Sequence, residues 1–159
     1  MRVGKHIRKP EVLLENLLEN FDHLRFIMPV RYPLDIMRST IEKGYYRLYP
    51  SLNNTSSEQE TLDAILKEMQ WFCQLKKQFP NFFFYFFEHQ FDRKKMIEMA
   101  LFLNVDLDEQ WLNDSLEIFN VSTPYEHAPD IKAYFTKQID NLFAEFPDFK
   151  LKLHYFLKK

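Results

Sequence analysis

Glycine is scarce in this sequence, which has 2 among its 159 residues, Gly4 and Gly44. Glycine tolerates positive φ and lets a backbone approach a phosphate closely. The scarcity therefore excludes a loop-rich fold and a glycine-built phosphate cradle, and it favours long helices. The hydrophobic content of 46% and a length typical of one domain allow a substantial core. We expect residues 1–159 to form a single domain.

Disulfides, an excess of positive charge and long apolar runs are also lacking. The single cysteine, Cys73, cannot form an internal disulfide, and its apolar helical position is typical of a core residue. With 21 Lys and Arg against 23 Asp and Glu, there is no basic stripe to follow a nucleic-acid backbone. No apolar run approaches the about 18 residues that span a bilayer, and no signal peptide is recognisable. We therefore predict a cytoplasmic protein with no membrane span and no nucleic-acid partner.

Aromatic residues are abundant instead, with 17 Phe in the chain. Two short apolar runs, 24–30 and 81–91, are each flanked by helical patterns, which predicts two buried strands. Pro29 argues against the first strand, because proline cannot donate a hydrogen bond to a sheet. Helices are predicted from Pro10, from Pro33 to Gly44, from the capping box Ser57–Glu60 to Pro80, from residue 93 to Leu103, from Asp106 or Asp108, and over Ile131–Leu157 with an interruption at Pro147.

Two strands separated by helices, without a hairpin signal, predict a helix-rich α/β fold that contains part of a doubly wound parallel sheet. Ligands bind such sheets at the carboxyl ends of the strands. Arg31 is the first charged residue after the first strand, and a helix begins at Pro33. A guanidinium and helix N–H groups both donate to oxygen, so this position predicts a phosphate site. Taken alone, Arg31 is better explained as a helix cap or as the partner of a surface carboxylate.

The segment Arg31-Tyr32-Pro33-Leu34-Asp35-Ile36-Met37-Arg38-Ser39 resembles the part of the sulfotransferase family that binds the 3′-phosphate of 3′-phosphoadenosine 5′-phosphosulfate (PAPS). The family pattern is an apolar strand, Arg, a polar residue, Pro, Asp two residues later, and Ser eight positions after the Arg. The runs 84–89 and 96–104 are similar to the family's later strand and helix. The resemblance implies a P-loop NTPase-like sulfotransferase fold. It also implies Arg31 and Ser39 as ligands of the 3′-phosphate in PAPS or its product adenosine 3′,5′-bisphosphate (PAP).

Upstream, the run 3–10 resembles the strand end where cytosolic sulfotransferases carry Lys-Thr-His. By that resemblance His6 is the candidate catalytic base, which takes a proton from an acceptor hydroxyl or amine, and Lys5 is the alternative residue in register. A solvated histidine without function is an equal alternative for His6. The acceptor would be a carbohydrate or a small molecule. The remaining histidines are too scattered to predict a metal site: His23, His89, His127 and His154.

The family's first strand and its Gly/Ser/Thr-rich phosphosulfate loop have no counterpart in this sequence. The resemblance therefore implies the C-terminal part of a sulfotransferase domain, and we expect a missing N-terminal segment or self-association to cover the open sheet edge. Three functions remain open: a sulfotransferase, a non-catalytic relic that binds the nucleotide, and a helical interaction module. Asp35 is expected to stabilise the first turn of its helix rather than to act as an acid.

Overall fold

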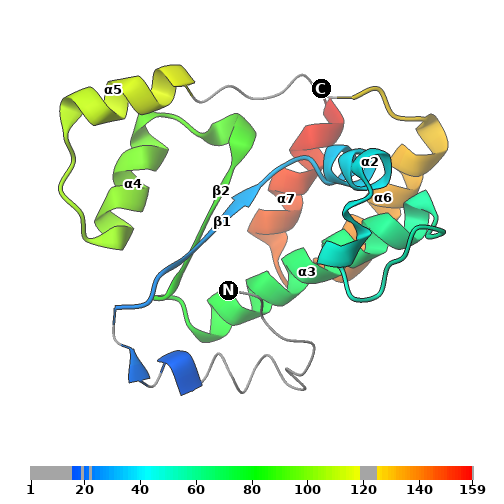
Figure 1. Ribbon diagram of the computed structural model, residues 1–159, viewed down its shortest axis with the longest axis horizontal. Coiled ribbons are helices and arrows are strands. Elements are labelled where there is room, and N and C mark those ends of the chain that lie inside the picture. The colour runs from blue at the N-terminus through cyan, green and yellow to red at the C-terminus, as the bar shows by residue number, and fades with distance from the viewer. Residues whose placement is uncertain (1–15, 19, 22, 119–124, 159) are drawn as a thin grey trace.

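A helix-rich α/β fold with a short parallel sheet is seen in the computed structural model of the chain, which describes residues 16–18, 20, 21, 23–118 and 125–158 (Figure 1). The sheet in the described part of the chain has two strands. This confirms the predicted α/β class and the parallel arrangement. The strands and α-helices are β1 (Phe26–Val30), α2 (Pro33–Lys43), α3 (Glu58–Gln78), β2 (Phe83–Phe87), α4 (Arg93–Leu103), α5 (Glu109–Ile118), α6 (Pro129–Leu142) and α7 (Pro147–Tyr155).

The two strands pair in parallel, in a register that runs from Phe26↔Phe83 to Val30↔Phe87. Because parallel strands point the same way, the chain leaves both of them at the same edge of the sheet. Helices cover both faces. On one face the Phe83 ring lies 5.3 Å from Phe72 of α3, and on the other Phe84 lies 5.4 Å from Phe102 of α4. Covering on both faces explains why both strands are nearly continuous apolar runs.

Pro29 lies within β1 without breaking it. The N–H of Phe26 donates to the carbonyl oxygen of Phe82 at 2.8 Å. The backbone N–H and carbonyl groups of the even-numbered residues of β1 therefore point toward β2, and the backbone of Pro29 points toward the opposite edge of the sheet. Proline is tolerated where its missing N–H would point away from the ladder. The strand prediction was therefore right, and the argument against it does not apply at this position.

Most helix boundaries follow the predicted signals. Gly44 ends α2 in the left-handed region at φ 68°, and Asn104 ends α4 there at φ 55°. Ser57 and Glu60 form the predicted capping box at the start of α3. The interruption at Pro147 separates α6 from α7, so the C-terminal part forms two helices. None of the described helices combines the length and apolar composition that crossing a membrane requires.

The main core forms where α2, α3, α6 and α7 pack against the ends of the strands. Leu34 and Met37 anchor α2 in this core, with exposed fractions of 0% and 1%. Each fully buried side chain of this size stabilises the fold by about 1.5–3 kcal/mol. The start of α2 is therefore held firmly beside the carboxyl end of β1. The other side chains that are completely buried here include Val30, Leu62, Leu66, Phe135, Ile139, Phe143 and Leu153.

Candidate functional site

Arg31 lies at the carboxyl edge of the sheet, directly after β1 and two residues before α2 begins at Pro33. This is the placement that the sequence predicted. Its side chain is 41% exposed, so solvent reaches the guanidinium. An arginine at this edge can donate two parallel hydrogen bonds to a phosphate or carboxylate.

The first turn of α2 offers fewer free N–H groups than predicted. Pro33 has no N–H, and the N–H groups of Asp35 and Ile36 both donate to the carbonyl oxygen of Tyr32, at 3.0 and 3.1 Å. The N–H of Leu34 belongs to a residue that is completely buried. The helix therefore adds few free N–H donors beside the guanidinium, contrary to the expectation that both would bind one ligand. The guanidinium is the principal donor at this edge.

Glu88 forms an ion pair with Arg31. The Nε atom of Arg31 lies 3.0 Å from Oε1 and 3.3 Å from Oε2 of Glu88, which directly follows β2. The parallel pairing explains this contact, because it brings the residues after both strands to the same edge. Pairing with a carboxylate was one of the alternatives that the sequence left open for Arg31. Glu88 itself was not predicted as a site residue.

The Glu88 carboxyl is less acidic than an ordinary glutamate. Burial raises its pKa above 4.5, and the neighbouring charge of Asp35 raises it further. The charge and hydrogen bond of Arg31 act in the opposite direction but do not cancel the effect of burial. Glu88 therefore takes up a proton at a higher pH than a solvated glutamate, and protonation weakens its hold on Arg31.

Ser39, the second predicted phosphate ligand, lies on α2 and is half-buried. It comes four residues after Asp35, so the two side chains share one side of the helix. Arg31 precedes the helix and Ser39 lies in its second turn. A ligand that reaches both residues must extend along the first two turns of α2.

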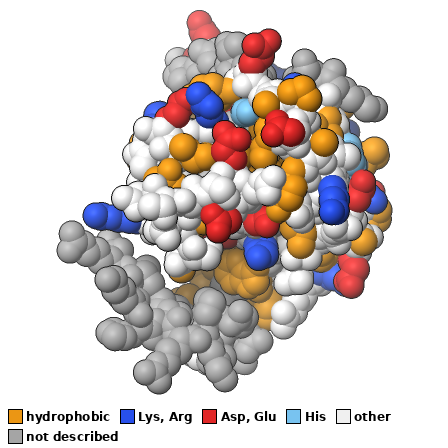
Figure 2. Space-filling model, turned by 90° about the vertical axis from the view of Figure 1, so that its right-hand side faces the viewer, with side chains coloured by type: hydrophobic (Ala, Val, Ile, Leu, Met, Phe, Trp, Pro, Cys, Tyr) orange, Lys and Arg blue, Asp and Glu red, His pale blue; other side chains and the backbone are white. Residues whose placement is uncertain are grey.

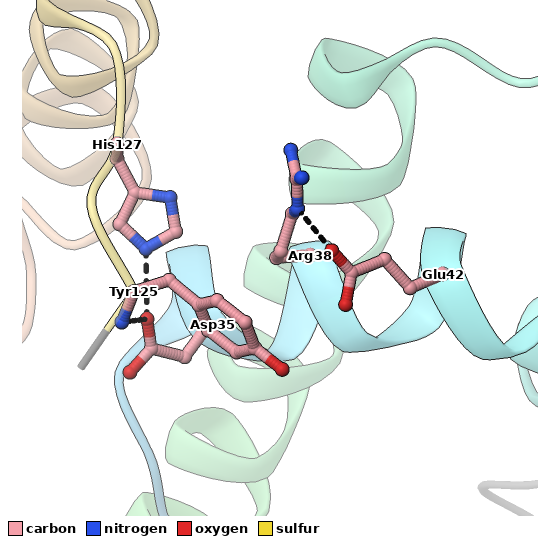
Figure 3. A network of polar contacts seen from close by, with 5 residues as sticks. All are labelled: Asp35, Arg38, Glu42, Tyr125 and His127. Carbon is pink, nitrogen blue, oxygen red and sulfur yellow. Dashed lines mark hydrogen bonds and ion pairs between the residues drawn. The ribbon is translucent and has the colours of Figure 1, made fainter. Parts of the chain in front are cut away.

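A buried polar network fixes the start of α2. The Oδ1 atom of Asp35 lies 2.7 Å from Nε2 of His127, and it accepts a hydrogen bond from the N–H of Tyr125 at 3.1 Å (Figure 3). The side chains of Asp35 and His127 are 7% and 3% exposed. The Tyr32 ring meets the His127 ring edge-on at 5.5 Å. Asp35 therefore joins the segment before α6 to the candidate site.

The sequence did not indicate this network. Asp35 was expected to stabilise the first helical turn, and it does lie there. Its partners Tyr125 and His127, however, follow 90 and 92 residues later in a loop. Without an alignment, no local pattern joins an aspartate to a histidine so far along the chain. On the same helix, Arg38 pairs with Glu42 at 2.6 Å on the surface, as Figure 3 shows.

Lys5 and His6, the candidate catalytic residues, lie outside the described residues. The described part of the chain contains no group of three or more His, Cys, Asp or Glu side chains placed to hold a metal ion. Cys73 is buried, and burial raises the pKa of its thiol to about 12. This thiol is therefore a poor nucleophile at neutral pH, in line with the predicted core role.

Comparison of the chain with family models, curated proteins and solved structures finds no match. The interpretation of the Arg31 site therefore depends on its residues and their geometry.

Proposed function

We propose that the chain binds the 3′-phosphate of PAPS or PAP at Arg31 and Ser39 and so supplies one half of a sulfotransferase site. The observation that carries the proposal is the position of Arg31 at the carboxyl edge of a parallel pair, immediately before a helix. This is where parallel α/β sheets bind ligands. The nine-residue pattern from Arg31 to Ser39 identifies the ligand class by resemblance to the sulfotransferase family. A P-loop-type fold is part of this proposal.

Glu88 gives the proposed site a competitor for the phosphate. An incoming phosphate and the Glu88 carboxylate both require the Arg31 guanidinium. Binding therefore exchanges an ion pair within the protein for one with the ligand, and the two negative charges repel each other. The raised pKa of Glu88 eases this exchange, because a protonated carboxyl neither repels the phosphate nor holds the guanidinium as tightly.

Catalysis would require groups beyond the phosphate site. In the proposed reaction the acceptor oxygen or nitrogen forms a bond to sulfur while the bond from sulfur to the 5′-phosphate oxygen breaks, which releases PAP. His6, or Lys5 in its place, would take the proton that the acceptor loses. The phosphosulfate loop would come from a segment other than residues 1–159, since a sequence with two glycines contains no Gly/Ser/Thr-rich run of that kind. A chain without that loop binds nucleotide and does not transfer sulfuryl groups.

Calorimetric titration with PAP tests the proposal. We expect saturable binding by the unsubstituted chain and binding roughly tenfold weaker or more for Arg31→Ala, the loss typical of a charge-assisted contact. Ser39→Ala is expected to weaken binding less, and Glu88→Gln to strengthen it. Arg38→Ala is the matched control, because it removes an exposed arginine of α2 that pairs with Glu42.

Two results would contradict the nucleotide site: no binding by a well-folded chain, and equal affinity of Arg31→Ala and the unsubstituted chain. Incubation of the chain with PAPS, candidate acceptors and a segment that supplies the phosphosulfate loop separates the enzyme from the relic. The relic predicts the same Arg31-dependent binding with no sulfuryl transfer.

A helical interaction module is the second candidate function. Large apolar side chains are exposed on and near the pair formed by α4 and α5, with exposed fractions of 73% for Leu101, 53% for Val105 and 50% for Trp111. Such side chains occur at contact surfaces between proteins. This function predicts a protein partner whose binding is unchanged by Arg31→Ala and weakened by Trp111→Ala.

A further inference from the structure

A groove of about 320 Å³ lies where β1, α2 and α3 meet, and Arg31 is not among the residues that line it. An adjoining hollow of about 240 Å³ shares three of its lining residues, so a ligand can enter from that side. We call the larger space the Trp71 groove. Its lining includes Met28, Ile36, Tyr49, Glu68, Trp71 and Phe72.

The groove brings a carboxylate together with three aromatic rings. Trp71 and Phe72 follow Glu68 on α3 by three and four residues, the spacing of neighbouring side chains on one helix face. Tyr49 reaches the same groove from the segment after α2. Burial raises the pKa of Tyr49 to about 12, and the charge of Glu68 contributes to this rise, so the Glu68 carboxylate lies close to the Tyr49 hydroxyl.

Glu68 gives the groove its charge. Among the described residues, it is the one charged side chain that lines the Trp71 groove, and no Lys, Arg or His forms an ion pair with it. Lys67 lines the adjoining hollow and not the groove. Glu68 is an exposed residue, but partial burial of its carboxyl raises its pKa above 4.5. A cation bound beside this carboxylate would offset the cost of that burial.

The walls favour a methylated ammonium ion over a primary one. A primary ammonium group has three N–H donors, and leaving them without acceptors against apolar side chains costs free energy. A quaternary ammonium ion has no N–H group, and its methyl groups pack against apolar walls. Aromatic faces attract its charge, and tryptophan does so most strongly. Trp71 is 38% exposed, so its ring is accessible to a ligand from solvent.

We propose that the Trp71 groove binds a small quaternary ammonium compound, with its charged group against the rings of Trp71, Tyr49 and Phe72 and beside the Glu68 carboxylate. This site is independent of the proposed nucleotide site, because neither Arg31 nor Ser39 lines the groove.

Calorimetric titration of the full chain with choline tests the proposal. Glu68→Gln removes the charge and keeps the size of the side chain, and we expect it to weaken binding roughly threefold or more. Trp71→Leu is expected to weaken binding by a similar factor, because it removes the aromatic face. Glu58→Gln is the matched control, since Glu58 is an exposed glutamate of the same α3 that does not line the groove.

Tryptophan fluorescence locates the bound choline, because the chain has two tryptophans, Trp71 and Trp111. In Trp111→Phe the remaining tryptophan is Trp71, and we expect choline to change its emission. In Trp71→Phe the remaining tryptophan is Trp111 on α5, outside the groove, and we expect no change. The reverse pattern would overturn the proposed location.

Three further results would overturn the proposal. They are no binding by the folded chain, equal affinity in Glu68→Gln and Glu58→Gln, and equal binding of 3,3-dimethylbutan-1-ol, the neutral analogue of choline. A melting curve for each variant shows whether it is folded. If Trp71→Leu fails to fold, the neutral analogue and Glu68→Gln still decide, because a cation site requires weaker binding in both.

Discussion

Glu88 shows how one side chain can tune the candidate site without belonging to the motif that reveals it. The Arg31–Glu88 ion pair forms because two parallel strands end together. Arg31 alone would be a permanent positive charge at the sheet edge. With Glu88 beside it, the edge is nearly neutral at high pH and becomes more positive as the carboxyl takes up a proton.

The raised pKa of Glu88 predicts a pH dependence of stability. A carboxyl whose pKa is higher in the folded than in the unfolded chain favours folding at low pH, and this contribution is lost as pH rises above 4.5 through the raised pKa. Glu88→Gln removes the titrating group. Urea unfolding on both sides of this range should therefore show that Glu88→Gln becomes more stable relative to the unsubstituted chain as pH rises. A constant difference would contradict the assignment.

Whether the surroundings of a residue could be predicted depended on how far along the sequence its partners lie. The place of Arg31 could be predicted, because a strand, a charged residue and a helix start follow one another directly in the sequence. The partners of Arg31 and Asp35 could not, because Glu88 and His127 come 57 and 92 residues later. The fold brings these distant residues together, and no local sequence pattern indicates that they are in contact.

The capping box of α3 is an element-scale feature that gives a direct prediction. Ser57 Oγ accepts a hydrogen bond from the N–H of Glu60, while Glu60 Oε2 accepts one from the N–H of Ser57 at 2.8 Å. Ser57→Ala is expected to lower the free energy of unfolding by about 0.5–2 kcal/mol. The control is Ser51→Ala, an exposed serine outside any helix. Equal chemical-denaturation midpoints for the two variants would show that the box contributes nothing measurable.

Elements were more predictable than contacts because their ends depend on short-range chemistry. Ser57, Gly44 and Asn104 each fix a helix end by a cap or a left-handed conformation, and each was visible in the sequence. The strands were recognisable from apolar runs with helices on both sides. The Asp35–His127 network and the Arg31–Glu88 ion pair both depend on how those elements pack.

At the scale of the whole molecule, the two edges of the short sheet invite further pairing. The backbone groups of the even-numbered residues of β1 point toward β2, so those of Ile27 and the carbonyl of Pro29 point toward the opposite edge. The Ile27 side chain is 37% exposed. On the outer edge of β2, the ammonium group of Lys76 donates a hydrogen bond to the carbonyl oxygen of Phe83. Lysine and proline at sheet edges both hinder pairing between chains, so within β1 Ile27 is the residue that offers both an N–H and a carbonyl group at the outer edge.

The outward N–H and carbonyl groups of Ile27 predict association through β1. Figure 2 shows hydrophobic side chains mixed with charged ones of both signs on the face of the molecule that lies at the right-hand side of Figure 1. We expect sedimentation velocity to show concentration-dependent association that Ile27→Lys reduces. The control is Leu48→Lys, which replaces an even more exposed hydrophobic side chain, 68% exposed, away from the sheet. A stable monomer with a cooperative melt at all concentrations would contradict this prediction.

The parallel pairing also has a consequence for how the chain is made. Arg31 and Glu88, which meet at the sheet edge, are 57 residues apart in the sequence. At a synthesis rate of about 5–20 residues per second, β1 waits roughly 3–11 seconds on the ribosome for its partner strand. During that time α3, with its own cap, can form locally. The aromatic strand β2, the most apolar run in the chain, is made after α3, which covers one face of the sheet, and before α4, which covers the other.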